Sequence, residues 1–316
     1  MLRTLLALSA TLAVLGRAPR AGADDVVGTR ALGMADALTG AAVGSAAVHL
    51  NPSGMTLVRG YVVEAAYGYR GNDGMSTFDG SVVDTLTSSL GAGVFFNYLT
   101  SSPKAGLFMP GTLPAEGKLD RSGYQVGLAL ALPLAEFLHL GATGKYATYE
   151  SRVANQAPLD SGSGFTLDAG ATLRLGSLVN LAVAGTNLID LKTRETPVGL
   201  AFGAALFALD ALVLDFDARL DFSSFQDVDG GDQVVPKYAF GGELFLQSVA
   251  LRAGYLNDRG ARYAAGRTPL ALQFATVGLS IVGRGGALDA GLRQQVSGSG
   301  DHETLFNVGL RLFLGQ

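Results

Sequence analysis

Few side chains in this sequence are of the types that carry out chemistry. His49, His139 and His302 are the three histidines of a chain without Cys, which leaves no thiol nucleophile and no thiolate metal ligand. A Ser-His-acid site, the weakest of three functional hypotheses, has no supporting motif. Residues 141–145 lack the spacing of a phosphate-binding loop. The sequence therefore predicts neither an enzyme nor a cofactor.

One acidic run has some features of a metal site. Asp227, Asp229 and Asp232 are interspersed with Val and Gly, but the acidic twelfth residue of an EF-hand is missing. A calcium loop and a solvated loop both stay open, and the missing spacing favours the solvated loop. No residue is therefore assigned as a metal ligand.

Composition limits the partners and the fold. The net charge is -4 and no basic stripe is present, which argues against a nucleic-acid partner. Charged residues make up 16% of the 316 residues, against about a quarter in soluble domains. Mean hydropathy is +0.30, yet beyond the N-terminus no apolar run reaches the roughly 18 residues of a spanning helix. A large soluble core and a transmembrane β-barrel are the two remaining options.

The N-terminus has the features of an export signal. Arg3 is followed by the apolar stretch 5–15 and by the small residues Ala21-Gly22-Ala23, which predicts a signal peptide over 1–23. A membrane anchor is the alternative, but the apolar stretch is too short to cross a bilayer. We therefore expect export; together with the strand pattern described below, this predicts the bacterial outer membrane as the destination.

Side-chain alternation is the main structural signal. Between positions 212 and 222, Leu, Leu, Phe, Ala, Leu and Phe alternate with Val, Asp, Asp, Arg and Asp. Period two places the two sets on opposite faces of a strand. A charge at the bilayer midplane costs about 2 to 4 kcal/mol in such barrels. One face therefore meets lipid, and the other lines a wet lumen.

The alternation recurs to the end of the chain and predicts an all-β fold, a transmembrane antiparallel up-and-down β-barrel of about fourteen strands over 59–316. The strands are placed near 60–71, 77–88, 90–101, 119–132, 136–150, 163–174, 177–188, 197–207, 210–222, 235–246, 248–257, 270–282, 285–296 and 303–314. A soluble β-sandwich is the alternative, but its polar face would be richer in Lys, Glu and Thr.

The connections between these strands alternate in length. Short links lie near 133–135, 175–176, 208–209, 247–248 and 282–284, and longer ones at 102–118, 151–162, 189–196, 223–234 and 258–269. Short turns are periplasmic in outer-membrane barrels. With an even strand count, both chain ends are therefore expected on the periplasmic side.

Residues 24–58 do not alternate. Residues 30–37 have the sequence R-A-L-G-M-A-D-A, small residues follow at 41–47, and Asn51-Pro52-Ser53-Gly54 stands before the first strand. This combination resembles the hatch of FadL-type hydrophobic-compound transporters and of PorV-like outer-membrane proteins. The resemblance implies a barrel of about fourteen strands with 24–58 folded into its lumen as a plug. The candidate plug residues are Arg30, Gly33, Asn51, Pro52 and Gly54.

The physical chemistry of the motif suits a compact plug. Pro52 fixes its own φ and moves Asn51 out of the helical region, while Gly54 permits a tight turn. One predicted strand offers a matching face of small residues, Gly199, Ala201, Gly203 and Ala205. An amphipathic helix over 31–48 that lies outside the pore is the alternative.

Charged residues of both signs fall on the lumen-facing positions of the strands. They are Glu64, Arg70, Lys145, Asp168, Arg174, Asp215, Asp217, Arg219, Lys237, Glu243, Arg252, Asp289, Arg293 and Arg311. Because the signs are mixed, pairing across strands that rigidifies the wall is expected rather than a selectivity ring.

The loop 102–118 is apolar where an extracellular loop is normally polar. Leu107, Phe108, Met109 and Leu113 are candidates for capture of an apolar ligand, and a lid over the barrel is an equal alternative. The first functional hypothesis is uptake of a fatty-acid-like hydrophobic small molecule, gated by the plug. The second is a non-transporting, PorV-like barrel that binds a partner protein.

Overall fold

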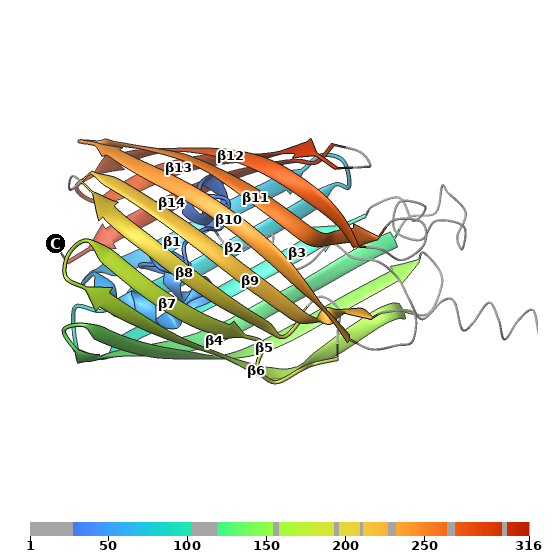
Figure 1. The fold of residues 1–316 in the computed structure, drawn as a ribbon, viewed down its shortest axis with the longest axis horizontal. Helices are drawn as coiled ribbons and strands as arrows, with labels where there is room; N and C mark the ends of the chain where they lie inside the picture. The colour runs from blue at the N-terminus through green and yellow to red at the C-terminus, as the bar shows by residue number, and fades with distance from the viewer. Residues whose placement is uncertain are drawn as a thin grey trace, which may run out of the picture.

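The fold is a closed antiparallel barrel of fourteen strands. The computed structural model describes residues 28–102, 119–153, 158–192, 196–208, 211–226, 232–263, 269–298 and 302–315. The strands are β1 Tyr61–Arg70, β2 Met75–Asp84, β3 Gly91–Ser101, β4 Leu119–Ala135, β5 Leu138–Val153, β6 Pro158–Leu175, β7 Val179–Thr186, β8 Gly199–Ala208, β9 Leu212–Gln226, β10 Asp232–Leu246, β11 Val249–Tyr263, β12 Pro269–Gly283, β13 Gly286–Ser297 and β14 Thr304–Leu314. Each strand pairs with its neighbour in sequence, and β1 closes the barrel on β14 (Figure 1).

Every predicted strand is present, but several extend further than predicted. β5 continues to Val153 and β6 already starts at Pro158. In the same way, β9 continues to Gln226 and β10 starts at Asp232, and β11 continues to Tyr263 and β12 starts at Pro269. The predicted long loops 151–162, 223–234 and 258–269 are therefore mostly strand. The reason is that backbone pairing continues through polar residues that show no alternation. The link predicted at 133–135 also moves, because β4 includes Ala135 and β5 starts at Leu138.

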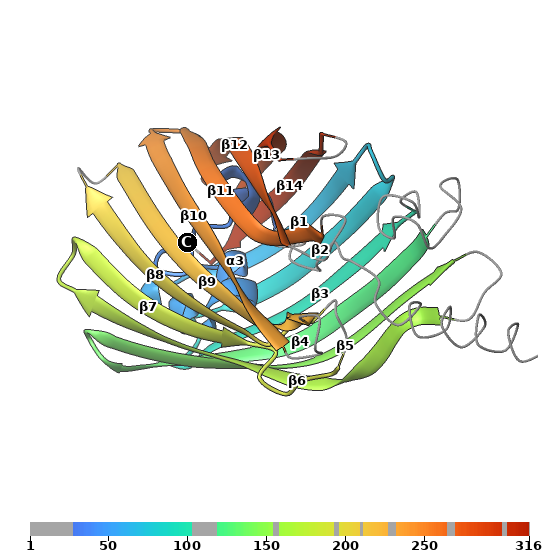
Figure 2. The ribbon, with the colours of Figure 1, turned by 45° about the vertical axis from the view of Figure 1, so that its right-hand side comes forward.

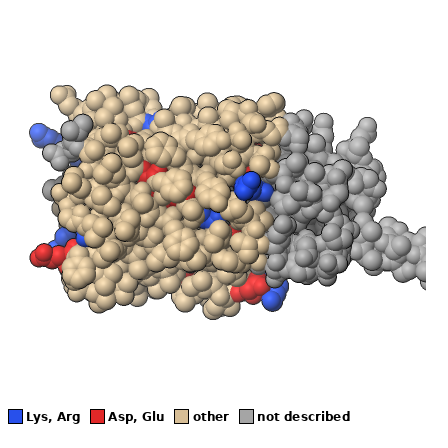
Figure 3. All heavy atoms as spheres, viewed as in Figure 1, with Lys and Arg blue, Asp and Glu red and all other residues tan. Residues whose placement is uncertain are grey.

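Alternation divides the wall into an apolar outer face and a charged inner face, as predicted. Phe216 is 49% exposed, whereas its neighbours Asp215 and Asp217 are 1% and 0% exposed. Figure 3 shows one side of the barrel, mostly free of charged side chains. An outward row of aromatic rings crosses β2 to β6 with centroids 5.1 to 6.5 Å apart, formed by Phe78, Phe96, Tyr124, Tyr146 and Phe165. An apolar outer surface with aromatic residues is typical of barrels that face a lipid bilayer.

The segment before β1 folds inside the barrel. It contains the short helices α2 (Gly28–Gly33) and α3 (Ser45–Leu50) and the 3-10 helix η2 (Pro52–Leu57), and Figure 2 shows them enclosed by the strands. Met34, Leu38 and Met55 have no exposed surface. The alternative of an amphipathic helix outside the pore is therefore wrong, because the small side chains of this segment let it fit within the wall. Among the described residues, no helix is long and apolar enough to cross a membrane.

Candidate functional site: the plug and the lumen

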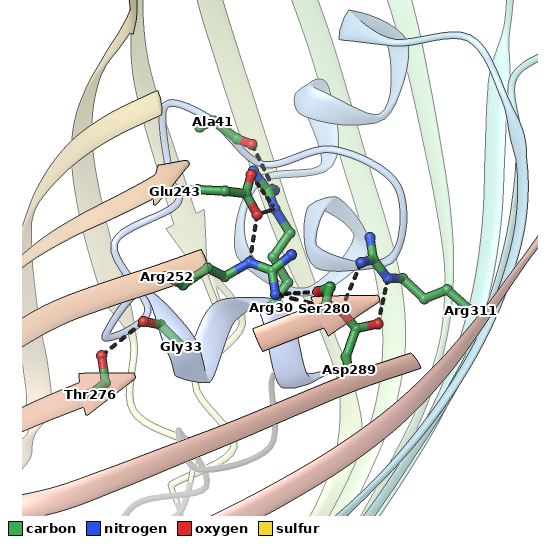
Figure 4. Close-up of polar contacts among 9 residues, drawn as sticks. All are labelled: Arg30, Gly33, Ala41, Glu243, Arg252, Thr276, Ser280, Asp289 and Arg311. Atoms are coloured by element: carbon green, nitrogen blue, oxygen red, sulfur yellow. Dashed lines mark hydrogen bonds and ion pairs between the residues drawn. The ribbon is translucent and has the colours of Figure 1, made fainter. Parts of the chain in front are cut away.

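An ion pair fixes the first plug helix to the wall. Nη2 of Arg30, in α2, lies 2.8 Å from Oε1 of Glu243, in β10, and its Nε donates to the same carboxylate at 3.1 and 3.2 Å. Nη1 of Arg30 donates to the carbonyl of Ala41 at 3.2 Å, so one guanidinium joins the helix, the following loop and the wall (Figure 4). Both side chains are almost fully buried, which makes loss of one partner costly.

The Arg30 pair belongs to a larger charged cluster. Arg252 in β11 contacts Glu243 at 2.5 Å and Asp289 at 3.5 Å. Arg311 in β14 donates two hydrogen bonds to Asp289, at 2.7 and 2.8 Å. The expected ion pairing across strands is therefore present, and Arg30 of the plug also takes part in it. Of the residues predicted to line the lumen, Arg174 is an exception, because it is exposed and donates to the Gly176 carbonyl at a short turn.

Two wall carboxylates hold the loop that follows α2. The backbone N–H of Thr39 donates to Asp217 at 3.1 Å, and its hydroxyl donates to the same carboxylate at 2.7 Å. The N–H of Ala41 donates to Asp215 at 2.8 Å. Both carboxylates come from β9 and are buried, so they satisfy loop donors that would otherwise lie unpaired inside the barrel.

Small residues on the wall let the plug backbone approach closely. A Cβ built on Gly33 would lie 3.1 Å from Cα of Gly278, and one built on Gly203 would lie 2.5 Å from the nitrogen of Gly40. The face of small residues predicted on β8 therefore does meet the plug. Sequence alone did not indicate a second contact surface for the plug, formed by Gly241 of β10 and Gly254 of β11 and called the glycine seat below. A Cβ on either glycine would lie 2.6 Å from backbone atoms of Met34.

The Asn51-Pro52-Ser53-Gly54 turn docks on β5 and β6. Asn51 caps η2 by accepting from the Ser53 N–H, and its Nδ2 donates to the Thr39 carbonyl at 2.8 Å and to the Thr172 hydroxyl at 3.0 Å. A Cβ on Gly54 would lie 2.1 Å from the carbonyl oxygen of Ala42, so no larger residue fits there.

We expect Asn51→Ala to loosen the plug. The substitution removes two donated hydrogen bonds and leaves the buried Thr39 carbonyl without its donor from Asn51, which costs about 1 to 3 kcal/mol. Hydrogen exchange of plug amides in the solubilised barrel should then accelerate roughly tenfold or more. Asn97→Ala is the control, because Asn97 is also a buried asparagine but belongs to β3 of the wall. Equal exchange in the two variants would show that other contacts hold the turn.

Helix α3 separates two cavities. The cavity on the side of the short turns, called the short-turn cavity below, has a volume of about 340 Å³ and reaches Ser45 and Ala46 at one end of α3. The second cavity, called the upper cavity, has a volume of about 120 Å³ and reaches His49 and Leu50 at the other end. The two linings share no residue. Within the described residues, α3 therefore lies between these two cavities.

Contacts that hold α3 differ from those that hold α2. His49 Nε2 lies 2.9 Å from Oδ2 of Asp79 in β2, and the His49 ring packs edge-on against Phe95. At its other end α3 is preceded by Gly44, which has φ 56° and ψ -133° and provides no side-chain cap. A helix of one and a half turns without a cap is weakly held by its own hydrogen bonds.

The remaining residues singled out by sequence have separate positions. His139 Nδ1 lies 2.8 Å from the Thr56 hydroxyl of η2, and His302 Nδ1 lies 3.3 Å from the Gln295 carbonyl. The capture candidates Leu107, Phe108, Met109 and Leu113, the signal peptide 1–23 and most of the acidic run 227–232 lie outside the described residues. Within the described part of the chain, no group of three or more His, Asp or Glu is placed to hold a metal ion.

A closed barrel with an apolar outside, a charged lumen and an inserted N-terminal plug defines a plugged barrel of the outer-membrane type. No family model matches the sequence, and no curated protein matches it significantly. Solved structures similar to it include the CymD monoaromatic hydrocarbon channel, with 12% identity and a TM-score of 0.69 over 92% of this chain and 98% of that one.

Two further structures give the same result. A FadL homologue of Pseudomonas aeruginosa has 13% identity and a TM-score of 0.68, and the toluene transporter TbuX of Ralstonia pickettii has 12% identity and a TM-score of 0.65, each over 92% of this chain and 98% of that one. At these identities the likeness is one of fold. The chain has the fold of the FadL-type outer-membrane channels, as the plug motif implied.

Proposed function

We propose that this chain is an outer-membrane channel for hydrophobic small molecules and that its N-terminal plug gates the lumen. The position of α3 between the short-turn cavity and the upper cavity is the observation that carries the proposal. In this proposal, a displacement of α3 joins the two cavities. The structures with the same fold are described as a monoaromatic hydrocarbon channel and a toluene transporter, which supports apolar ligands here too.

Within this proposal the two halves of the plug have different roles. Helix α2 is the fixed part, because Arg30 and the loop 38–41 are tied to buried carboxylates of β9 and β10. Helix α3 is the moving part, held by the His49–Asp79 pair and entered through Gly44. Leu107, Phe108, Met109 and Leu113 of the loop 102–118 would capture the ligand before it enters the upper cavity.

Uptake of radiolabelled toluene and of a radiolabelled fatty acid by whole cells tests this function. Cells that express the full chain should take up at least one probe faster than cells with an empty vector. Deletion of 24–58 should keep uptake and add ion conductance in planar bilayers, because the plug no longer fills the lumen. Negligible uptake by both the full chain and the deletion variant would refute the channel and favour a barrel that binds a partner protein.

A further inference from the structure

The upper cavity has polar side chains along one wall and apolar side chains beside α3. Asn97 of β3, Gln125 of β4 and Lys145 of β5 line the polar wall, and Phe95 and Leu50 line the apolar part. Asn97 is directly opposite Gln125 in the register of β3 and β4, and Lys145 is diagonally opposite Gln125 in the register of β4 and β5. Side chains in these positions are within reach of one another. The volume of about 120 Å³ is comparable with the roughly 150 Å³ of a cavity that binds benzene.

Asn97 is a buried amide without a partner. The residue is 6% exposed, and its side chain makes no hydrogen bond to any residue that the structure describes. Buried polar groups are nearly always hydrogen-bonded, and an unpaired one costs free energy. Because Asn97 lines the upper cavity, a molecule in this cavity can satisfy both its N–H donors and its carbonyl oxygen.

The neighbours of Asn97 also have unused hydrogen-bonding capacity. Gln125 donates from Nε2 to the Tyr149 hydroxyl at 2.7 Å, and its Oε1 accepts no hydrogen bond from the described residues. Nζ of Lys145 lies 2.7 Å from Oδ2 of Asp168, which uses one of the three donors of the ammonium group. The polar wall therefore offers acceptors on Asn97 and Gln125 and donors on Asn97 and Lys145.

Every cationic side chain that lines the upper cavity already has a carboxylate partner. The nitrogen-to-oxygen distances are 2.7 Å for Lys145–Asp168, 3.0 Å for Arg219–Asp217, 3.5 Å for Lys237–Asp258 and 2.9 Å for His49–Asp79. A ligand carboxylate would therefore compete with a carboxylate of the protein. It would also lie near Asp168 and Asp221, which line the same cavity, where a low dielectric makes the repulsion of like charges strong. An uncharged ligand avoids both costs.

A primary carboxamide matches the hydrogen-bonding groups of the polar wall. It has two N–H donors and a carbonyl oxygen with two lone pairs. One N–H and the oxygen can pair with the oxygen and an N–H of the Asn97 amide. The second N–H then matches Oε1 of Gln125, and the second lone pair matches an N–H of Lys145. A hydrocarbon satisfies none of these groups, and a hydroxyl, with a single donor, satisfies fewer of them.

We propose that the upper cavity binds a small uncharged carboxamide with an apolar body, such as benzamide, with its amide on Asn97 and its ring beside Phe95. This inference rests on the proposed function, because the cavity lies in the lumen of the proposed channel. It names a ligand class for that channel and separates carboxamides from plain hydrocarbons and from acids.

Three planar probes of similar size, benzamide, acetophenone and benzoate, test the proposal. Acetophenone has a methyl group in place of the NH2 group, so it leaves the acceptors on Asn97 and Gln125 unpaired. Binding to the full barrel in detergent is measured by equilibrium dialysis and corrected with the same detergent without protein. Benzamide should bind about tenfold more tightly than acetophenone, and benzoate should bind more weakly than benzamide. This comparison needs no variant, so a substitution that misfolds cannot obscure it.

A variant then assigns the preference to Asn97. Asn97→Leu removes the amide and should reduce the preference for benzamide over acetophenone several-fold, with acetophenone binding unchanged. Asn257→Leu is the matched control, because Oδ1 of Asn257 is also buried without a hydrogen-bond partner, but this residue lies on β11 and does not line the upper cavity.

Two results would overturn the inference. One is equal binding of benzamide and acetophenone by the unmodified barrel, and the other is a preference for benzamide that survives Asn97→Leu. Toluene uptake by cells reports separately on the channel. Toluene uptake without a preference for benzamide would therefore refute the carboxamide site alone, whereas benzamide binding without uptake of any probe would refute the proposed channel.

Discussion

Fastening α3 to the wall should stop uptake. A Cβ built on Gly93 of β3 lies 2.7 Å from Cγ1 of Val48 in α3, near the roughly 3 Å between Sγ of one half-cystine and Cβ of the other. The double variant Val48→Cys/Gly93→Cys introduces the only two cysteines of the chain, and the compartment to which it is exported is oxidising. Uptake of radiolabelled toluene should fall to the level of the empty vector and return when a reductant is added.

A second cysteine pair provides the matched control. A Cβ on Gly309 of β14 lies 3.4 Å from Cβ of Thr29 in α2, close to the separation in a disulfide. Thr29→Cys/Gly309→Cys fastens the half of the plug that we propose is fixed, so its oxidised form should keep uptake within about twofold of its reduced form. Loss of uptake in both oxidised variants would show that the plug moves as one body. Undiminished uptake with α3 fastened would rule out α3 as the gate.

Filling the glycine seat should convert the closed barrel into an open pore. Gly241 and Gly254 are paired across β10 and β11, and a Cβ on either would lie 2.6 Å from backbone atoms of Met34. Overpacking costs about 1 to 3 kcal/mol at each site. Gly241→Val/Gly254→Val should therefore shift the equilibrium between the bound and the displaced plug at least about thirtyfold. Planar bilayers should show a steady conductance that the unmodified protein lacks.

Gly144→Val is the control for this experiment. Gly144 lies on the outward face of β5, and a Cβ added there meets no atom within 4 Å. The added side chain faces lipid, so conductance should stay at the level of the unmodified barrel. The double variant could instead show no conductance and normal heat stability. This result would mean that the plug accommodates the two side chains by a local shift, and that the glycine seat does not determine whether the lumen is closed.

The barrel was largely predictable because its signal is local. Alternation in β9, with Phe216 outward and Asp215 and Asp217 inward, follows from the period of a strand and needs no knowledge of its neighbours. Strand ends were less predictable. β11 continues to Tyr263 through Asp, Arg and Gly residues, where backbone hydrogen bonds and not side-chain polarity maintain the pairing.

The site was predictable only as a set of residue types. Sequence placed Glu243, Arg252 and Asp289 on the inner face and Arg30 in a plug motif, but their pairing depends on barrel closure, which brings Arg30 to a residue 213 positions away. The same holds for Gly254, because its close contact with the Met34 backbone is visible only in the folded structure.

The sequence by itself determined a two-faced wall and a plug motif, because alternation and turn residues act over a few neighbouring positions. The tertiary structure alone decided which carboxylate holds which donor, and that opposite ends of α3 reach two different cavities. Those features depend on distances across the barrel, which are set when β1 pairs with β14 and the plug is enclosed.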